Sequence, residues 1–148
     1  MIFRELQPSV GGVDVGMGDP VGNGFQAALV IGTPQTDWDL LPVGKYVTIT
    51  FQSPDSAEQF TLTVATPVEN GSSVTIQPLQ QPSDSQLWTA HETNGQWTFV
   101  PKLAPQYVLQ MTNGAIGFGG LLSVGPPSDA PEQQATQLWI FADENSDP

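Results

Sequence analysis

The triplets Gln86-Leu87-Trp88 and Gln137-Leu138-Trp139 are identical, and Thr36-Asp37-Trp38 is a degenerate earlier copy. The three tryptophans are spaced by 50 and 51 residues. Recurrence at a fixed period of this length is typical of folds built from repeated supersecondary units. Three such units account for the whole chain of 148 residues, with approximate bounds at 1–44, 45–94 and 95–144 and a polar tail at 143–148.

Short segments that alternate apolar and polar residues fill each unit, as half-buried strands do. Residues 46–51, for example, place Val47, Ile49 and Phe51 on one face. One four-stranded unit cannot bury its apolar face, so we expect three units to pack about a common axis with their tryptophans in the core. The sequence therefore predicts a single all-β domain, a β-trefoil of twelve strands. The expected strands are 2–3, 13–15, 28–31, 38–40, 46–51, 60–64, 74–76, 86–90, 97–100, 107–109, 121–124 and 137–141.

Helices have little place in this pattern. Glycine and proline, at 15 and 14 residues, interrupt every stretch long enough for three amphipathic turns. No run reaches the ~18 apolar residues that a membrane-spanning helix needs. We expect no significant helix, no membrane insertion and, because Met1–Glu5 does not begin a signal peptide, a cytoplasmic protein.

The composition excludes several functions. The chain carries a formal charge of −12, with Arg4, Lys45 and Lys102 as its only basic residues apart from one histidine. Such a surface cannot neutralise a run of phosphates, so we expect no nucleic-acid partner. Cysteine is absent, which rules out disulfides and thiolate metal sites.

The repeated Gln-x-Trp triplet near the end of each ~50-residue unit resembles the ricin B-type lectins, particularly the small cysteine-free cytoplasmic lectins of mushrooms. The resemblance implies a fungal defence protein that binds glycans or glycoproteins without catalysis. It also implies one shallow sugar site in each unit. In this family an aspartate on the second strand and polar side chains before the tryptophan take sugar hydroxyls, while an aromatic ring stacks on the sugar. Dimerisation would add avidity to a weak single site.

Applied to this chain, the family pattern favours the first unit. Asp14 lies between Val13 and Val15, whereas the second and third units have Thr63 and Gln110 where the aspartate is expected. Phe25 and Phe118 are the nearest candidates for a stacking ring. The predicted sugar-binding residues are Asp14, Asn23, Gln26, Gln35 and Asp37.

Other chemistry has little support in the sequence. His91 is the only histidine, which excludes a two-histidine metal site and leaves few routes to a catalytic triad. We therefore predict no enzyme activity, no metal and no cofactor. Gln86 and Gln137 are expected to tie their loops to the backbone rather than to bind ligand.

Two other functions stay open. Trefoils of this size include fungal protease inhibitors, and residues 100–105 could form a rigid extended loop in which Pro101, Lys102 and Leu103 enter a protease cleft. In the other alternative, the protein is a trefoil interaction subunit that has lost sugar binding.

Overall fold

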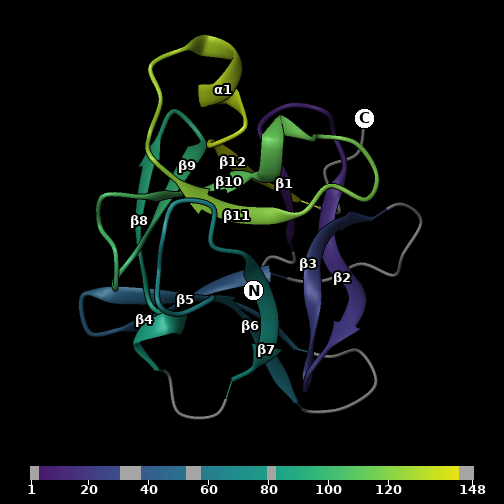
Figure 1. Cartoon of the computed structure of the whole chain (residues 1–148), viewed down its shortest axis with the longest axis vertical. Coiled ribbons are helices and arrows are strands. Elements are labelled where there is room, and N and C mark those ends of the chain that lie inside the picture. The colour runs from purple at the N-terminus through teal and green to yellow at the C-terminus, as the bar shows by residue number, and fades with distance from the viewer. Residues whose placement is uncertain (1–3, 31–37, 53–57, 80–82, 144–148) are drawn as a thin grey trace.

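The computed structural model describes residues 4–30, 38–52, 58–79 and 83–143. Within these residues twelve strands follow one another, as the sequence predicted, and the fold is an all-β trefoil (Figure 1). The strands are β1 (Arg4–Pro8), β2 (Asp14–Val21), β3 (Gly24–Val30), β4 (Trp38–Val43), β5 (Tyr46–Gln52), β6 (Gln59–Val64), β7 (Val74–Pro78), β8 (Trp88–Thr93), β9 (Gln96–Pro101), β10 (Val108–Met111), β11 (Leu122–Gly125) and β12 (Trp139–Asp143).

The strands divide into a barrel and a cap. Antiparallel pairs run from β1 through β12, β9, β8 and β5 to β4. The other six strands form three antiparallel hairpins, β2–β3, β6–β7 and β10–β11. Residues of the three hairpins meet one another, through β3 and β7 and through the isolated bridges Ala28–Leu121 and Ser73–Ser123. Each repeat thus contributes two barrel strands and one hairpin.

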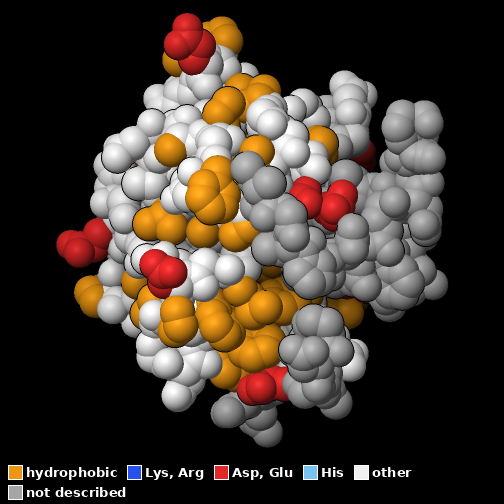
Figure 2. Space-filling model, turned by 90° about the vertical axis from the view of Figure 1, so that its right-hand side faces the viewer, with side chains coloured by type: hydrophobic (Ala, Val, Ile, Leu, Met, Phe, Trp, Pro, Cys, Tyr) orange, Lys and Arg blue, Asp and Glu red, His pale blue; other side chains and the backbone are white. Residues whose placement is uncertain are grey.

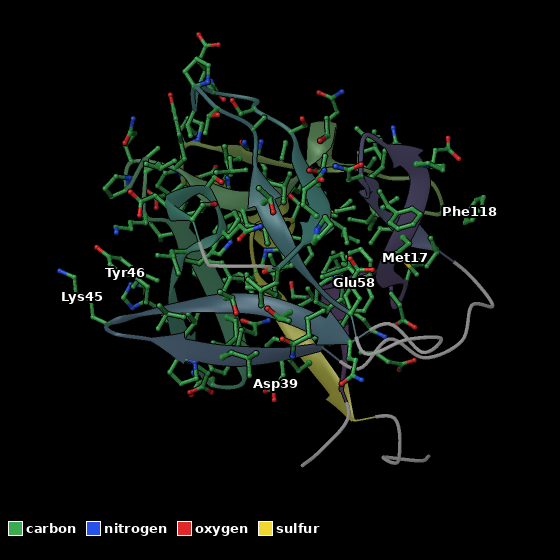
Figure 3. The ribbon with its side chains drawn as sticks, turned by 90° about the horizontal axis from the view of Figure 1, so that it is seen from below. Met17, Asp39, Lys45, Tyr46, Glu58 and Phe118 are labelled. Carbon is green, nitrogen blue, oxygen red and sulfur yellow. The ribbon has the colours of Figure 1, made fainter. Side chains whose placement is uncertain are left out.

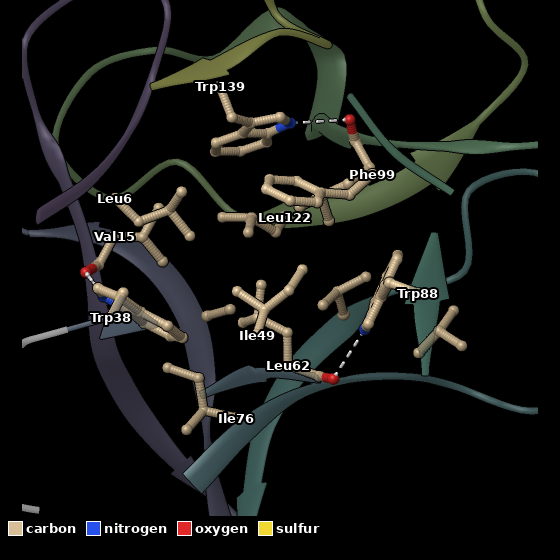
Figure 4. Packing of buried hydrophobic residues seen from close by; sticks show 14 of the residues in the cluster. Leu6, Val15, Trp38, Ile49, Leu62, Ile76, Trp88, Phe99, Leu122 and Trp139 are labelled. Carbon is tan, nitrogen blue, oxygen red and sulfur yellow. Dashed lines mark hydrogen bonds between the residues drawn. The ribbon is translucent and has the colours of Figure 1, made fainter. Parts of the chain in front are cut away.

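The three repeat tryptophans belong to the buried hydrophobic core (Figure 4). Trp38, Trp88 and Trp139 are each at most 1% exposed. Their indole N–H groups donate to backbone carbonyls on the second strand of the same repeat, so the buried nitrogens are satisfied. The acceptors are the carbonyls of Val15, Leu62 and Leu109, at 3.2, 3.2 and 3.1 Å.

In the part of the chain that the structure describes, helical structure is limited to short segments: the five-residue helix α1 (Pro131–Ala135) and two 3₁₀ turns, η1 (Asp84–Gln86) and η2 (Thr112–Gly114). The helix α1, which the sequence pattern does not predict, begins at a proline, a residue well suited to a first helical turn. No helix of the described part is long and apolar enough to cross a membrane.

Alternation along β5 does not separate a buried face from a solvated one. Thr48 and Thr50 are as buried as Ile49 and Phe51. The Thr50 hydroxyl donates to the Thr48 hydroxyl at 2.7 Å, which satisfies these polar groups inside the protein. Hydrogen bonding between threonines therefore allows β5 to be covered on both sides.

Candidate functional site

The tryptophan hydrogen bonds determine which residues are equivalent in the three repeats. In each repeat the indole donates to the carbonyl of one aliphatic residue on the second strand. The side chain of the residue after that one projects from the opposite face of the strand. The equivalent residues at this next position are Gly16, Thr63 and Gln110. Their partners on the adjacent strand are Ala28, Thr75 and Ser123. The first repeat therefore has no polar side chain at either position.

This alignment corrects the one used in the sequence analysis. The counterpart of Thr63 and Gln110 is Gly16, and Asp14 lies two residues earlier on β2. The sequence could not distinguish the two alignments because Val13-Asp14-Val15 and Val15-Gly16-Met17 show the same apolar periodicity, and a shift of two residues keeps every side chain on its own face.

The first repeat also lacks space for a side chain at Gly16. A Cβ built on Gly16 would lie 2.6 Å from Cγ2 of Val30, so the Val30 side chain occupies the space that a side chain at residue 16 would need. Asp14 itself is half-buried, and its carboxylate accepts a hydrogen bond of 2.7 Å from Nε2 of Gln7. Part of the capacity of this carboxylate to accept hydrogen bonds is therefore used within the protein.

The first-repeat residues predicted to bind sugar are not all brought together. Asp14 pairs with Val30 at one end of the β2–β3 hairpin, while exposed Asn23 lies in the turn at the other end. At ~3.3 Å per residue, Asn23 is about 20 Å from Asp14 along the hairpin, and Gln26, which pairs with Thr75, is about 13 Å away. These residues cannot surround one small sugar ring together. Gln35 and Asp37 lie outside the described residues.

The third repeat offers a better-formed site around Gln110. Oε1 of Gln110 accepts a hydrogen bond from Nε2 of Gln137 at 3.2 Å, and Nε2 of Gln110 donates to the Ser123 hydroxyl at 3.3 Å. Gln137 is held by two further bonds, to the carbonyl of Pro126 at 2.8 Å and from the backbone N–H of Ser128 at 2.9 Å. The amide of Gln110 thus has a fixed orientation.

A pocket of about 440 Å³ lies beside this amide. Backbone and side-chain bonds join its walls: the Met111 N–H donates to the carbonyl of Thr136 at 3.1 Å, and the Thr136 hydroxyl donates to the carbonyl of Gln133 at 2.7 Å. These bonds attach α1 to the end of β10. The lining residues are Gln110, Met111, Asn113, Gly114, Glu132, Gln133 and Thr136.

Hydrogen-bonding chemistry dominates this pocket. An amide has two N–H donors and an oxygen with two lone pairs, so a residue already bonded at both ends can still offer a donor and an acceptor. Gln110, Asn113 and Gln133 supply amides, and Glu132 supplies a carboxylate that accepts hydrogen bonds with charge assistance. In the sequence, the one indication of this site is Gln110, which stands where the family pattern has an aspartate.

The second repeat has a weaker version of the same arrangement. Nε2 of Gln86 lies 3.4 Å from the Thr63 hydroxyl and 3.3 Å from the carbonyl of Pro78. The prediction that Gln86 and Gln137 tie their loops to the backbone is therefore confirmed. Their loops differ in length, since Gln86 follows its proline partner by eight residues and Gln137 follows Pro126 by eleven.

The loop proposed for protease inhibition is a compact turn. Pro101 is buried as the last residue of β9, and the Ala104 N–H donates back to its carbonyl at 3.2 Å. Nζ of Lys102 forms an ion pair of 2.8 Å with Asp84, which raises the pKa of Lys102 above its ordinary value. Leu103 is exposed. The extended conformation expected for residues 100–105 is not found.

The two lysines share one neighbour. Nζ of Lys102 lies 5.0 Å and Nζ of Lys45 5.5 Å from the centre of the Tyr46 ring. Figure 3 shows Lys45 and Tyr46 at one end of the molecule, far from Met17 and Phe118. On the face drawn in Figure 2, carboxylates and apolar side chains are visible, and no lysine or arginine appears among the coloured atoms.

Neither candidate stacking ring lines the pocket beside Gln110. Phe25 is half-buried and makes an edge contact with Phe60, with ring centres 6.0 Å apart. Phe118 is 71% exposed in the segment between η2 and β11. A sugar in the pocket beside Gln110 would therefore be held mainly by hydrogen bonds.

The single histidine lies on the surface. His91 is exposed and belongs to β8, where it pairs with Thr98, rather than to the turn that follows. Among the residues that the structure describes, no group of three or more histidine, aspartate or glutamate side chains could hold a metal ion.

The chain resembles several solved structures, although no family model and no curated protein matches it. The designed threefold-symmetric protein ThreeFoil is 16% identical, with a TM-score of 0.74 over 95% of this chain and 98% of that one. A Macrolepiota procera ricin B-like lectin in complex with lactose is 11% identical, with a TM-score of 0.66 over 95% and 94%. A proteinase inhibitor from Coprinopsis cinerea is 14% identical, with a TM-score of 0.66 over 95% and 96%. At these identities the likeness shows the fold alone, and that fold is the β-trefoil that ricin B-like lectins and a proteinase inhibitor share.

Proposed function

We propose that this protein is a non-enzymatic carbohydrate-binding protein, a lectin, whose principal sugar site is the pocket of the third repeat. One observation carries the proposal. The amide of Gln110, fixed by Gln137 and Ser123, lies at a pocket of about 440 Å³ that Asn113 and Glu132 also line. This is also the position at which the family pattern has its sugar-binding aspartate.

The chemistry suits neutral sugars. Neighbouring hydroxyls of a pyranose each offer a donor and an acceptor, and a preoriented amide can complement both at once. The carboxylate of Glu132 adds an acceptor. Because Gln110 is already fixed by two hydrogen bonds, little side-chain entropy is lost when it binds a ligand. The Macrolepiota procera neighbour, with its bound lactose, supports this chemistry by analogy.

Sugar binding at the first-repeat site around Asp14 stays a separate prediction. Asp14 and Gln26 each carry groups able to bind a hydroxyl, but the repeat alignment that favoured Asp14 no longer supports it. The cytoplasmic location, the fungal source, the defensive role and a homodimer remain further parts of the proposal, implied by the family resemblance.

Protease inhibition is the competing function, and the structural similarity to the Coprinopsis cinerea proteinase inhibitor is the observation that supports it. The compact turn at Pro101 and the ion pair of Lys102 with Asp84 argue against insertion of this lysine into a protease cleft. An inhibitory lysine would have to leave its carboxylate partner.

The test begins with a glycan array, with lactose as a soluble probe, followed by titration of the strongest ligand. Asn113 has a φ of 55°, a conformation that glycine adopts without strain, so Asn113→Gly removes the amide and leaves the backbone in place. We expect binding about tenfold weaker, the loss of ~1.4 kcal/mol from one or two hydrogen bonds, and binding by Asp14→Ala within about twofold of the wild-type protein. A blank array, or loss of binding in Asp14→Ala alone, would overturn the proposal.

A further inference from the structure

We infer that the ligand is a neutral oligosaccharide whose chain crosses α1 into a second pocket, so that the protein recognises several sugar units rather than one. This inference rests on the proposed function. The second pocket measures about 350 Å³ and lies between the β8–β9 hairpin and α1. Its lining residues are Thr93, Asn94, Gln96, Thr98, Gln134 and Leu138.

The two pockets share α1 as a wall. Gln133 lines the pocket beside Gln110, and the next residue, Gln134, lines the pocket at the hairpin. Side chains of successive helical residues point ~100° apart, so one short helix presents side chains to both sides. A helix with its side chains is about 10–12 Å wide, which an oligosaccharide of a few units can cross.

The loop that carries this helix is longer in the third repeat. Gln137 follows Pro126 by eleven residues, whereas Gln86 follows Pro78 by eight in the second repeat. The described part of the second-repeat loop contains the turn η1, and the third-repeat loop contains α1. The longer loop of the third repeat, with its helix α1, thus forms a wall of both pockets.

The second pocket has the chemistry of a site for neutral hydroxyl groups. Two threonine hydroxyls and three amides, those of Asn94, Gln96 and Gln134, line it, and none of the described residues that line it is charged. Half-buried Leu138 offers an apolar patch for the C–H groups of a sugar. In a protein with a charge of −12, an anionic sugar would be repelled, so the uncharged lining favours a neutral chain.

The chain provides a matched pair of variants. Asn94 and Asn113 have φ values of 54° and 55°, and both are exposed. Asn94→Gly and Asn113→Gly each remove one amide at a backbone conformation that glycine adopts freely, and each changes only one pocket. Gln134→Ala is a second variant of the hairpin pocket, on an exposed helical residue.

The experiment titrates the wild-type protein and these variants with the strongest monosaccharide on the array and with its oligomers of two to four units. We expect wild-type affinity to rise about tenfold with chain length. Asn94→Gly and Gln134→Ala are expected to bind the monosaccharide within twofold of the wild-type protein and to lose the gain from longer chains, whereas Asn113→Gly weakens every ligand.

Each contrary outcome has its own meaning. Monosaccharide binding with no gain from longer chains, or a gain that both hairpin-pocket variants retain, overturns the inference and leaves the proposed function standing. Equal loss of monosaccharide binding in Asn94→Gly and Asn113→Gly also overturns it, because the two pockets would not be separate subsites. Failure of the wild-type protein to bind any sugar refutes the proposed function and this inference with it.

Discussion

Replacing Gln137 with alanine should destabilise the protein and loosen its candidate site together. The side chain is 3% exposed and makes three hydrogen bonds, with Gln110, Pro126 and Ser128, at 2.8–3.2 Å. At about 1 kcal/mol for each bond, Gln137→Ala should lower the free energy of unfolding by about 3 kcal/mol. In a domain of this size the melting temperature would fall by roughly 6–12 °C.

The second repeat provides the control for this prediction. Gln86 makes the equivalent contacts to Thr63, Pro78 and Ser83, at 3.3–3.4 Å. All three contacts are longer than the two shortest bonds of Gln137, at 2.8 and 2.9 Å, and are therefore weaker, so Gln86→Ala should cost only about 1 kcal/mol. The difference between the two variants isolates hydrogen-bond quality, because both remove the same side chain from the same place in a repeat.

Urea unfolding followed by tryptophan fluorescence measures both values, with the slope of the transition as a check on two-state behaviour. Gln137→Ala should also weaken sugar binding, because Gln110 loses the partner of its oxygen. Equal destabilisation by the two variants, or a cost below about 1 kcal/mol for Gln137→Ala, would refute the reasoning.

Three further predictions concern the fold and the alternative function. Trp88→Phe should cost on the order of 2 kcal/mol in urea unfolding, from a lost hydrogen bond and lost volume, and Trp38→Phe about the same, because both indoles are equally buried and bonded. Gly16→Ala should cost about 1–3 kcal/mol through its clash with Val30, and a Val30→Ala background should remove much of that cost, which a double-mutant cycle measures. Lys102→Ala should leave any trypsin inhibition unchanged in an enzyme assay. Its small effect on stability should be constant from neutral pH up to the ordinary lysine pKa of 10.5 and vanish as the pH rises through the raised pKa of Lys102.

The repeat could be predicted from the sequence because it rests on the largest side chains. Trp38, Trp88 and Trp139 need buried positions with a hydrogen-bond acceptor, and their two nearly equal spacings leave few architectures that provide such positions. Strand alternation then located eleven of the strands, β2 to β12, whereas the first expected segment, 2–3, lies outside the described residues and β1 begins at Arg4.

The site was harder to predict, for two physical reasons. Alternation has period two, so it cannot distinguish Asp14 from Gly16 as the residue opposite Ala28 in the hairpin. The helix α1 depends on a loop enlarged by three residues, and five residues are too few for an amphipathic pattern. Only the tertiary contacts of Gln110 and Thr136 show that this loop forms a wall of a pocket.

The most direct test of the central claim is to map the sugar on the protein in solution. Backbone amide NMR shifts of the wild-type chain would be followed while the strongest array ligand is added. We expect the largest shifts at Asn113, Gly114 and Gln133, around the third-repeat pocket, with little change near Gly16. Shifts centred on Asp14 and its neighbours on β2, with the residues around Gln110 unaffected, would contradict it.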